Sequence, residues 1–224
     1  MTVRTTPGDQ RDRTRGPRLR QWLVPFLALA LAGACASHPK PPTADAPPPR
    51  PIDLTGLTVM VLPAQPAAAT PQAAAAAFDA ELAYWLADRA PRVRWVAASE
   101  VERLAKSSPG LRIDPHALDV RAFARMRVRR IGDPLFGDVH NLGAMLDARL
   151  ALLPAGLTYV SPHDSTGAPL PGPGRFEVTA ALIQTFGGEV AWYGVVAGEP
   201  GPIDAPAGIA TAARALARAL TQGN

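Results

Sequence analysis

The sequence predicts a single α/β domain over residues 53–224, folded as an α/β sandwich with a mixed sheet. Short apolar runs, with the length and β-branched content typical of buried strands, alternate with longer stretches whose apolar residues recur at helical spacing. Near the C-terminus, two strand-like runs flank the short turn F-G-G-E, which indicates a β-hairpin. A leader and a proline-rich segment precede the domain.

The leader, residues 1–34, has the layout of a bacterial signal peptide. Arg18 and Arg20 end a basic region, and an apolar run over residues 22–34 closes on the small residues A-G-A. This run is shorter than the roughly 20 apolar residues that a membrane-spanning helix needs. The sequence therefore predicts a cleaved signal peptide and not a permanent anchor.

Cys35 is the only cysteine, and it follows these small residues directly. The stretch L-A-G-A-C resembles the bacterial lipobox, which implies that Cys35 is acylated, for instance with palmitate, and attaches the protein to a lipid bilayer. An ordinary signal peptide with an incidental cysteine is the alternative. Ala36 stands where an Asp would resemble an inner-membrane retention signal, so we expect an outer-membrane lipoprotein that faces the periplasm.

Residues 35–52 form a proline-rich segment that we interpret as a tether. Proline lacks a backbone N–H and fixes φ, so neither helix nor sheet is expected there. In polyproline geometry, at about 3.1 Å per residue, the segment would hold the domain up to ~50 Å from the membrane. A disordered linker with no spacer role is the alternative.

The excess of basic residues belongs to the leader. The leader holds six of the 23 basic residues and two of the 19 acidic ones, so 17 of each remain from Cys35 onward. A balanced chain of this kind gives no reason to expect a nucleic-acid partner. With its single cysteine acylated, the domain has no thiol for a disulfide and depends on its apolar core.

The first half of the domain is predicted as strand, helix, strand and helix, over residues 57–62, 72–90, 93–96 and from 99 onward. The apolar face of the first helix, which should pack on the sheet, consists of Phe78, Leu82, Trp85 and Leu86. Ser99 and Glu102 have the spacing of a capping box at the start of the second helix.

The second half is predicted to contain two helices, three strands and a last helix. Asp114 and Pro115 should open a helix, and Leu142 and Met145 should face inward from the next one. The helices and strands that follow residue 130 are expected over residues 135–145, 148–153, 175–185, 190–197 and 207–221. The loop 161–174 is rich in turn-forming residues and should be exposed.

Three stretches resemble one group of proteins. They are L-T-V-M-V-L-P, N-L-G-A-M-L-D-A-R-L-A-L-L-P and F-E-V-T-A-A-L-I-Q-T-F-G-G-E-V-A-W-Y-G. They look like the shared pattern of small envelope lipoproteins, a group with the TolB amino-terminal domain, the lipoprotein activators of peptidoglycan synthases and the curli secretion channel. The resemblance covers most of residues 53–222 and implies an α/β fold; Gln184 stands where the group often has Asp. A pore is not expected, because transmembrane strands must alternate over several hairpins, and the single hairpin here is apolar on both faces.

The sequence contains no motif of a hydrolase elbow, a zinc protease, a P-loop or a dinucleotide site, so no enzyme activity, cofactor or metal is expected. Two weaker alternatives remain. The first is a divalent-metal site that forms on folding from Asp133, Asp138, His140 and Asp147. The second is a hydrolytic group in the exposed loop, from Ser161, His163 and Ser165, where a rigid frame is hard to supply.

The strongest charge cluster consists of Arg121, Arg125, Arg127, Arg129 and Arg130. These residues would suit contact with anionic lipid head groups or with an acidic partner. The alternative is a solvated surface offset by the carboxylates Asp114, Asp119, Asp133 and Asp138. Trp192 and Tyr193 are neighbours on one strand and should point to opposite faces, which leaves Tyr193 as a second candidate for partner contact.

Together these patterns predict a membrane-anchored envelope lipoprotein that acts as a non-enzymatic module and binds another envelope protein or itself. Two other functions remain as alternatives: an envelope hydrolase that uses the region 133–147, and a ring-forming export subunit. The sequence identifies no particular partner.

Overall fold

The computed structural model describes residues 52–68, 70–125 and 128–222, which belong to one compact unit, Ala46–Asn224. The predicted signal peptide, Cys35 and all but the last residue of the predicted tether lie outside the described residues. Within the described part of the chain, none of the helices combines the length and apolar character needed to cross a bilayer.

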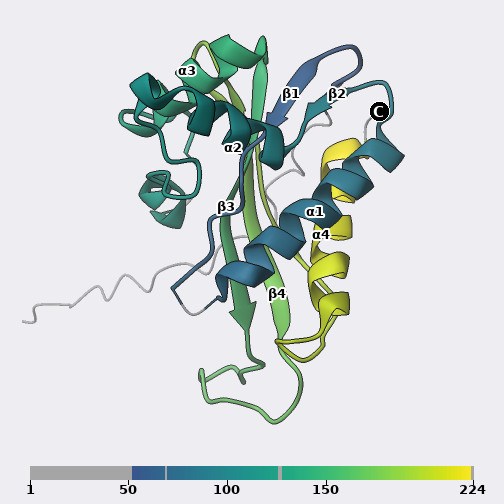
Figure 1. Cartoon of the computed structure of the whole chain (residues 1–224). Coiled ribbons are helices and arrows are strands. Elements are labelled where there is room, and N and C mark those ends of the chain that lie inside the picture. Colours follow the sequence, from purple (N-terminus) through teal and green to yellow (C-terminus); the bar gives the residue numbers. More distant parts are fainter. Residues whose placement is uncertain (1–51, 69, 126–127, 223–224) are drawn as a thin grey trace, which may run out of the picture. The chain divides into compact units, whose positions relative to one another are not determined.

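A five-stranded mixed sheet forms the centre of the domain (Figure 1). Its strands are β1 (Thr58–Val61), β2 (Arg94–Val96), β3 (Leu150–Val160), β4 (Arg175–Gln184) and β5 (Val190–Ala197), in the order β2-β1-β3-β4-β5. β1 pairs in parallel with β2 and with β3, whereas β3–β4 and β4–β5 are antiparallel. The predicted hairpin and the predicted mixed sheet are both confirmed.

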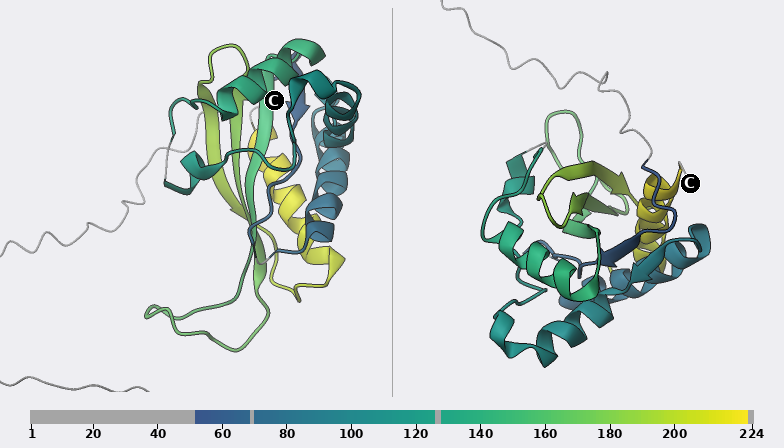
Figure 2. Two further views of the ribbon diagram at one scale, coloured as in Figure 1. Left: turned by 60° about the vertical axis from the view of Figure 1, so that its left-hand side comes forward. Right: turned by 90° about the horizontal axis from the view of Figure 1, so that it is seen from above.

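Helices cover both faces of this sheet (Figure 2). α1 (Gln72–Arg89) and α4 (Pro206–Thr221) pack side by side on one face, and α2 (Ala98–Ser107) and α3 (Leu135–Leu146) lie on the other. This arrangement confirms the α/β sandwich. The chain passes from the α1 face to the α2 face through β2, at one edge of the sheet.

The core under α1 and α4 matches the predicted apolar faces. Phe78, Leu82 and Leu86 are fully buried, and Trp85 packs half-buried against the same cluster. From the sheet they meet alternate residues of β4, namely Phe176, Val178, Ala180 and Leu182. Strand alternation therefore selects the face that the helices cover.

The second core differs from the prediction at the end of α3. Leu135, Val139 and Leu142 follow the i, i+4, i+7 spacing of one helix face and are buried. Met145 lies roughly 90° away from the mean direction of these three residues, at 100° per residue. It is 49 % exposed, so its predicted inward position is wrong.

The helix predicted from Asp114 is also wrong. The chain there makes turns and the short 3-10 helices η1 (Pro109–Leu111) and η2 (Arg121–Arg125). The buried side chain of Gln65 donates to the carbonyl of Pro115 and accepts from the N–H of Leu118, at 2.9 and 3.2 Å. These backbone groups are thus bonded to a distant residue instead of to a helical turn.

Two further element boundaries differ from the prediction. α2 starts at Ala98 with Ala97 as its N-cap and no side-chain cap, so the predicted capping box does not form. β3 runs on from Leu153 to Val160, because an irregularity in its pairing between Pro154 and Gly156 accommodates the proline inside the strand.

Candidate functional site

The predicted basic cluster is divided in the structure. Arg121 forms a two-pronged ion pair with Asp119, at 2.7 and 2.5 Å, and this contact lowers the pKa of Asp119 to about 2. Arg130 lies 3.7 Å from Glu189, while Arg129 is exposed. The side chain of Arg125 and the whole of Arg127 lie outside the described residues. Asp119 thus offsets one of the arginines, as the solvated-surface alternative expected.

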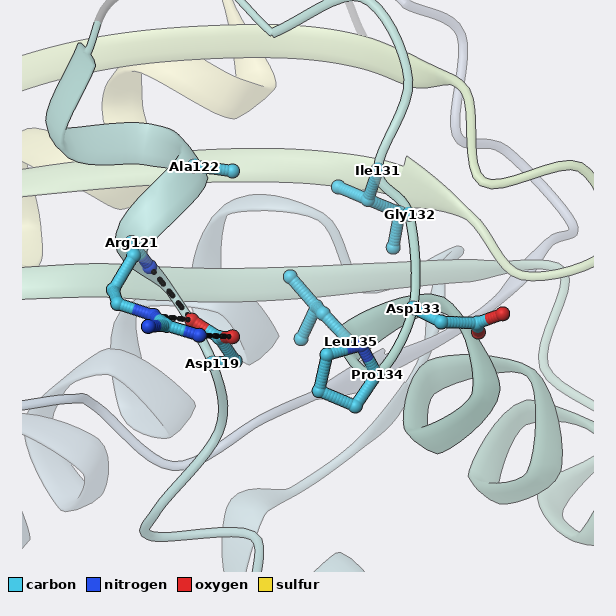
Figure 3. A pocket seen from close by; sticks show the side chains of 8 residues that line it. All are labelled: Asp119, Arg121, Ala122, Ile131, Gly132, Asp133, Pro134 and Leu135. Carbon is cyan, nitrogen blue, oxygen red and sulfur yellow. Dashed lines mark hydrogen bonds and ion pairs between the residues drawn. The ribbon is translucent and has the colours of Figure 1, made fainter.

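A hollow of about 360 Å³ lies beside Arg121, between η2 and the start of α3 (Figure 3). Its wall includes Asp119 and Arg121 on one side and Ile131 to Leu135 on the other. Its charged groups are already engaged: Arg121 binds Asp119, and the carboxylate of Asp133 accepts the N–H of Gly137 at 3.1 Å. Asp133 is therefore bonded to the first turn of α3.

The four residues of the predicted alternative site are spread along α3. Asp133 precedes the helix and Asp147 follows it, so a helix of 12 residues, about 18 Å long, separates them. Burial, and to a lesser degree the charge of Asp133, raises the pKa of Asp138. Across the described ranges, no group of three His, Cys, Asp or Glu residues is placed to hold a metal ion. The proposed convergence of these residues does not occur.

His140 has a structural environment on α3. Its Nδ1 lies 3.2 Å from the carbonyl oxygen of Thr185, and its ring packs between those of Phe136 and Phe186. The imidazole thereby joins α3 to the turn between β4 and β5.

The exposed loop 161–174 does not assemble a hydrolytic group. Nδ1 of His163 lies 2.6 Å from the backbone carbonyl of Ser161, not from a hydroxyl group. Asp164 accepts bonds from the side chain of Thr166 and from the backbone N–H groups of Thr166 and Ala168, and these bonds lower its pKa. The carboxylate therefore organises the loop itself.

Sequence reasoning missed Asp79 on α1. Both its oxygens accept the N–H of Ala64, at 3.0 and 3.2 Å, and burial raises its pKa to about 7, with Glu102 adding to the rise. Glu102 also lies 3.4 Å from Nε2 of His116. The signal was present in the sequence, because Asp79 stands one turn after Ala75 and one turn before Leu82, on the buried side of the helix.

Tyr193 and Trp192 point to opposite faces, as predicted. Trp192 is buried on the face of the sheet that α4 covers, and Tyr193 is half-buried on the opposite face. The Tyr193 ring stacks on Phe123 at 6.1 Å, and its hydroxyl group donates to the carbonyl of Phe123 at 3.5 Å. A direct role for Tyr193 in partner contact remains a prediction. Val195, two residues further on the same face, is 57 % exposed.

Beyond its first residue, the outer edge of β5 pairs with no other strand of the described residues. Gly198 N–H donates to the carbonyl of Phe176 at 2.9 Å, which continues the β4–β5 ladder and fixes its phase. Bonded and non-bonded residues alternate in an antiparallel pair, so the backbone groups of Tyr193, Val195 and Ala197 point away from β4. In the described part of the chain, the pairing on that side is the bridge between Arg130 and Glu189, in which the N–H of Val190, the first residue of β5, donates to the carbonyl of Arg129 at 2.9 Å.

The face of the sheet beside this edge is half covered. In the left-hand view of Figure 2, the segment from α2 to α3 covers the upper half of this face, while the lower half of β3, β4 and β5 extends past it. The residues on this lower half are partly or fully exposed and mostly small or β-branched: Gly156, Thr158, Val160, Glu177, Thr179, Val195 and Ala197.

The fold and these sites describe an α/β sandwich domain with an open sheet edge and, among the described residues, no assembled catalytic group. No protein-family model and no curated protein sequence matches the chain. Similar solved structures include lipoprotein GNA1162 from Neisseria meningitidis, at 17 % identity and a TM-score of 0.41, over 65 % of this chain and 84 % of that one. They also include the PelC dodecamer from Paraburkholderia phytofirmans, at 15 % identity and a TM-score of 0.41, over 78 % and 93 % of the two chains. At these values the likeness assigns no function.

Proposed function

We propose that the chain is a lipid-anchored, non-enzymatic envelope protein whose domain binds an envelope protein, or a second copy of itself, along the outer edge of β5. The observation that carries the proposal is the open, uncharged edge of β5 next to the half-covered face of the sheet. Cys35 and the leader supply the anchor in the sequence.

The composition of β5 supports pairing with another strand. Residues 190–197 contain no charged residue and no proline, and they include the exposed Val195. Natural edge strands are usually short, charged or interrupted, since an open edge recruits other strands. An edge without these devices fits addition of a strand from a partner, with backbone hydrogen bonds supplying affinity.

The opposite edge of the sheet shows the contrast. β2 has three residues, and one of them is the exposed Arg94. A short strand with a charged side chain is protected against strand addition. The protein therefore protects one edge of its sheet and leaves the other open.

Val195→Pro tests this edge with little disturbance of the fold. The N–H of Val195 faces away from β4, so its loss removes no β4–β5 hydrogen bond and blocks an added strand. We expect the variant to lose its in-envelope cross-links to a partner or to a second copy. We also expect the purified acylated chain in detergent to have a lower mass, because the complex or self-association is lost. Tyr84→Lys, at a side chain 63 % exposed on α1, is the matched control and should retain it.

The outcomes separate the alternatives. Loss of a defined hetero-partner supports an adaptor, and loss of a closed homo-oligomer supports the ring-forming subunit. If a folded Val195→Pro protein keeps every cross-link and the same mass, the edge proposal is wrong.

The anchor is tested independently by mass spectrometry of the N-terminal peptide of the protein from membranes. We expect acyl chains on Cys35, and we expect Cys35→Ser to leave the membrane fraction. An unmodified Cys35 in a processed protein contradicts the anchor and leaves the β5 edge to be judged separately.

A further inference from the structure

One end of the sheet, which we name the entry end, is where the described chain enters the domain at Ile52. It comprises the first residues of β1, β2 and β3, the last turn of α1 and the turn between β4 and β5. Three backbone bonds hold it together: Gly56 N–H to Arg92, Arg149 N–H to Thr58 and Thr185 N–H to Arg149, each at 3.1 Å. It lies at the top of Figure 1, and the loop 161–174 lies at the bottom.

The entry end gathers arginines without partners. Five exposed arginines there make no ion pair with any carboxylate of the described residues: Arg89, Arg92, Arg94, Arg129 and Arg149. In the strand register, Arg94 lies on one side of Thr58 and Arg149 on the other. The two arginines therefore form one row with Thr58 across the starts of three neighbouring strands. The carboxylates of this end are Asp53, Asp88, Asp147 and Glu189, and Glu189 pairs with Arg130. Asp133 and Asp138 at the start of α3 are further carboxylates near this end, but none of these carboxylates lies within ion-pair distance of the five arginines.

Apolar side chains are exposed at the same end. Phe186, in the turn between β4 and β5, is 65 % exposed, and Met145, in the last turn of α3, is 49 % exposed. Phe186 follows Thr185, whose N–H binds the carbonyl of Arg149. The aromatic residue thus adjoins a segment that carries an unpaired guanidinium group.

We propose that the entry end binds the anionic phospholipid head groups of the membrane that holds Cys35. This inference rests on the lipid anchor of the proposed function. A guanidinium group can bind two phosphate oxygens at once. Each arginine near an anionic membrane surface strengthens membrane binding roughly fivefold. Exposed Phe and Met side chains enter the head-group region beside such cations.

The membrane is the expected partner of this surface, because the segment that leads to Cys35 joins the domain at this end. About 17 residues separate Cys35 from Ile52, and in an extended form they reach roughly 50 Å, so anchoring alone does not orient the domain. They also keep the entry end at a high effective concentration near the bilayer. Contact at this end directs the exposed part of β5 and the loop 161–174 away from the membrane, where a protein partner can reach them.

Two reporter positions test the orientation in the full, acylated chain. Ala87→Cys lies at the entry end and Ser165→Cys in the loop at the far end, and both side chains are exposed. Each protein is labelled with a fluorophore and placed in phosphatidylcholine vesicles, with or without about 30 mol % phosphatidylglycerol, that contain a head-group quencher. We expect strong quenching of the label at position 87 only with the anionic lipid, weak quenching of the label at position 165, and loss of the difference at high salt.

A matched pair of variants identifies the cations. Replacing Arg89, Arg92, Arg94 and Arg149 by Gln should reduce the ratio of the two quenching signals to about 1. Replacing the exposed Arg103, Lys106, Arg112 and Arg175 by Gln changes the net charge equally and should leave the ratio unchanged. Equal quenching of both labels in vesicles that carry the otherwise unaltered chain overturns the inference and leaves the anchor intact. A chain that does not float with the vesicles contradicts the anchor, and the inference with it.

Discussion

The arginines at the two ends of the sheet differ in whether they are paired with carboxylates. At the entry end, Arg92, Arg94 and Arg149 have no ion-pair partner among the described residues, whereas at the far end Arg175 is paired with Glu177 and Arg214 with Glu199. The far end also uses its carboxylates locally, as Asp164 does within the loop. Pairing satisfies charges inside the molecule, and its absence leaves them available to an outside surface. The unpaired arginines of the entry end are therefore available to an anionic surface outside the molecule, whereas Arg175 and Arg214 at the far end are already neutralised by neighbouring carboxylates.

The largest expected effect concerns Asp79, the carboxylate whose pKa burial raises to about 7, which lies between the two ends. Its pKa of about 7 in the fold exceeds the unfolded value of 3.8, so the folded state binds the extra proton between these pH values. Stability should therefore fall as pH rises from about 4 to 7, by up to about 4 kcal/mol.

Asp79→Asn removes this dependence, because an amide oxygen still accepts the N–H of Ala64 and carries no charge. We expect a higher unfolding temperature than wild type at pH 8 and little difference at pH 4. Denaturation over pH 4 to 8 measures it. A variant less stable than wild type at pH 8 would show that the carboxylate is ionised and favourably bonded, and that buried charge is not the main electrostatic cost.

The second prediction tests how tightly the entry end is packed. A Cβ on Gly143 of α3 would lie 2.7 Å from two side-chain atoms of Thr185, whereas a Cβ on Gly137 of the same helix meets only Asp133, at 3.4 Å. We expect Gly143→Ala to be less stable than Gly137→Ala by about 1–3 kcal/mol in urea unfolding. Equal stability of the two variants would mean that the turn after β4 moves freely, and the entry end could not present Phe186 in a fixed position.

The third prediction concerns the far end, where a single phenol joins three segments. The hydroxyl group of Tyr159 donates to the carbonyl of Gly201 and accepts the N–H of Gly174, both at 2.8 Å. Tyr159→Phe leaves both backbone groups without this partner, so we expect a loss of about 1–2 kcal/mol. Hydrogen exchange should rise at Gly174 and stay unchanged at Thr185. An effect spread over both ends would contradict the independence of the two ends.

The sequence predicted those parts of the fold that depend on local periodicity. The buried face of α1, the alternation of β4 and the opposite positions of Trp192 and Tyr193 follow from spacings of 3.6 and 2 residues. The region after Asp114 failed because Gln65, about 50 residues earlier, takes its backbone bonds. A hydrogen bond between residues so far apart in the chain leaves no local pattern in the sequence.

The candidate surfaces were harder to predict for the same reason. The open edge of β5 requires the strand order, and the row of Arg94 and Arg149 requires the register across β1. The sequence instead singled out the five arginines spaced closely between residues 121 and 130, of which Arg121 is bound to Asp119. Clustering along the chain is a poor guide to clustering in space when the strands come from distant segments.

The smallest expected effect distinguishes a paired from an unpaired arginine. Arg175 lies 2.9 Å from Glu177, and both side chains are partly exposed, so Arg175→Gln should lower stability by about 0.5 kcal/mol or less. Arg149→Gln removes no ion pair within the described residues and should leave stability unchanged. On anionic vesicles the order reverses: Arg149→Gln should weaken the quenching of the label at position 87, and Arg175→Gln should not. If Arg175→Gln weakens it as much, net charge alone attracts the domain, and the entry end has no special place in membrane contact.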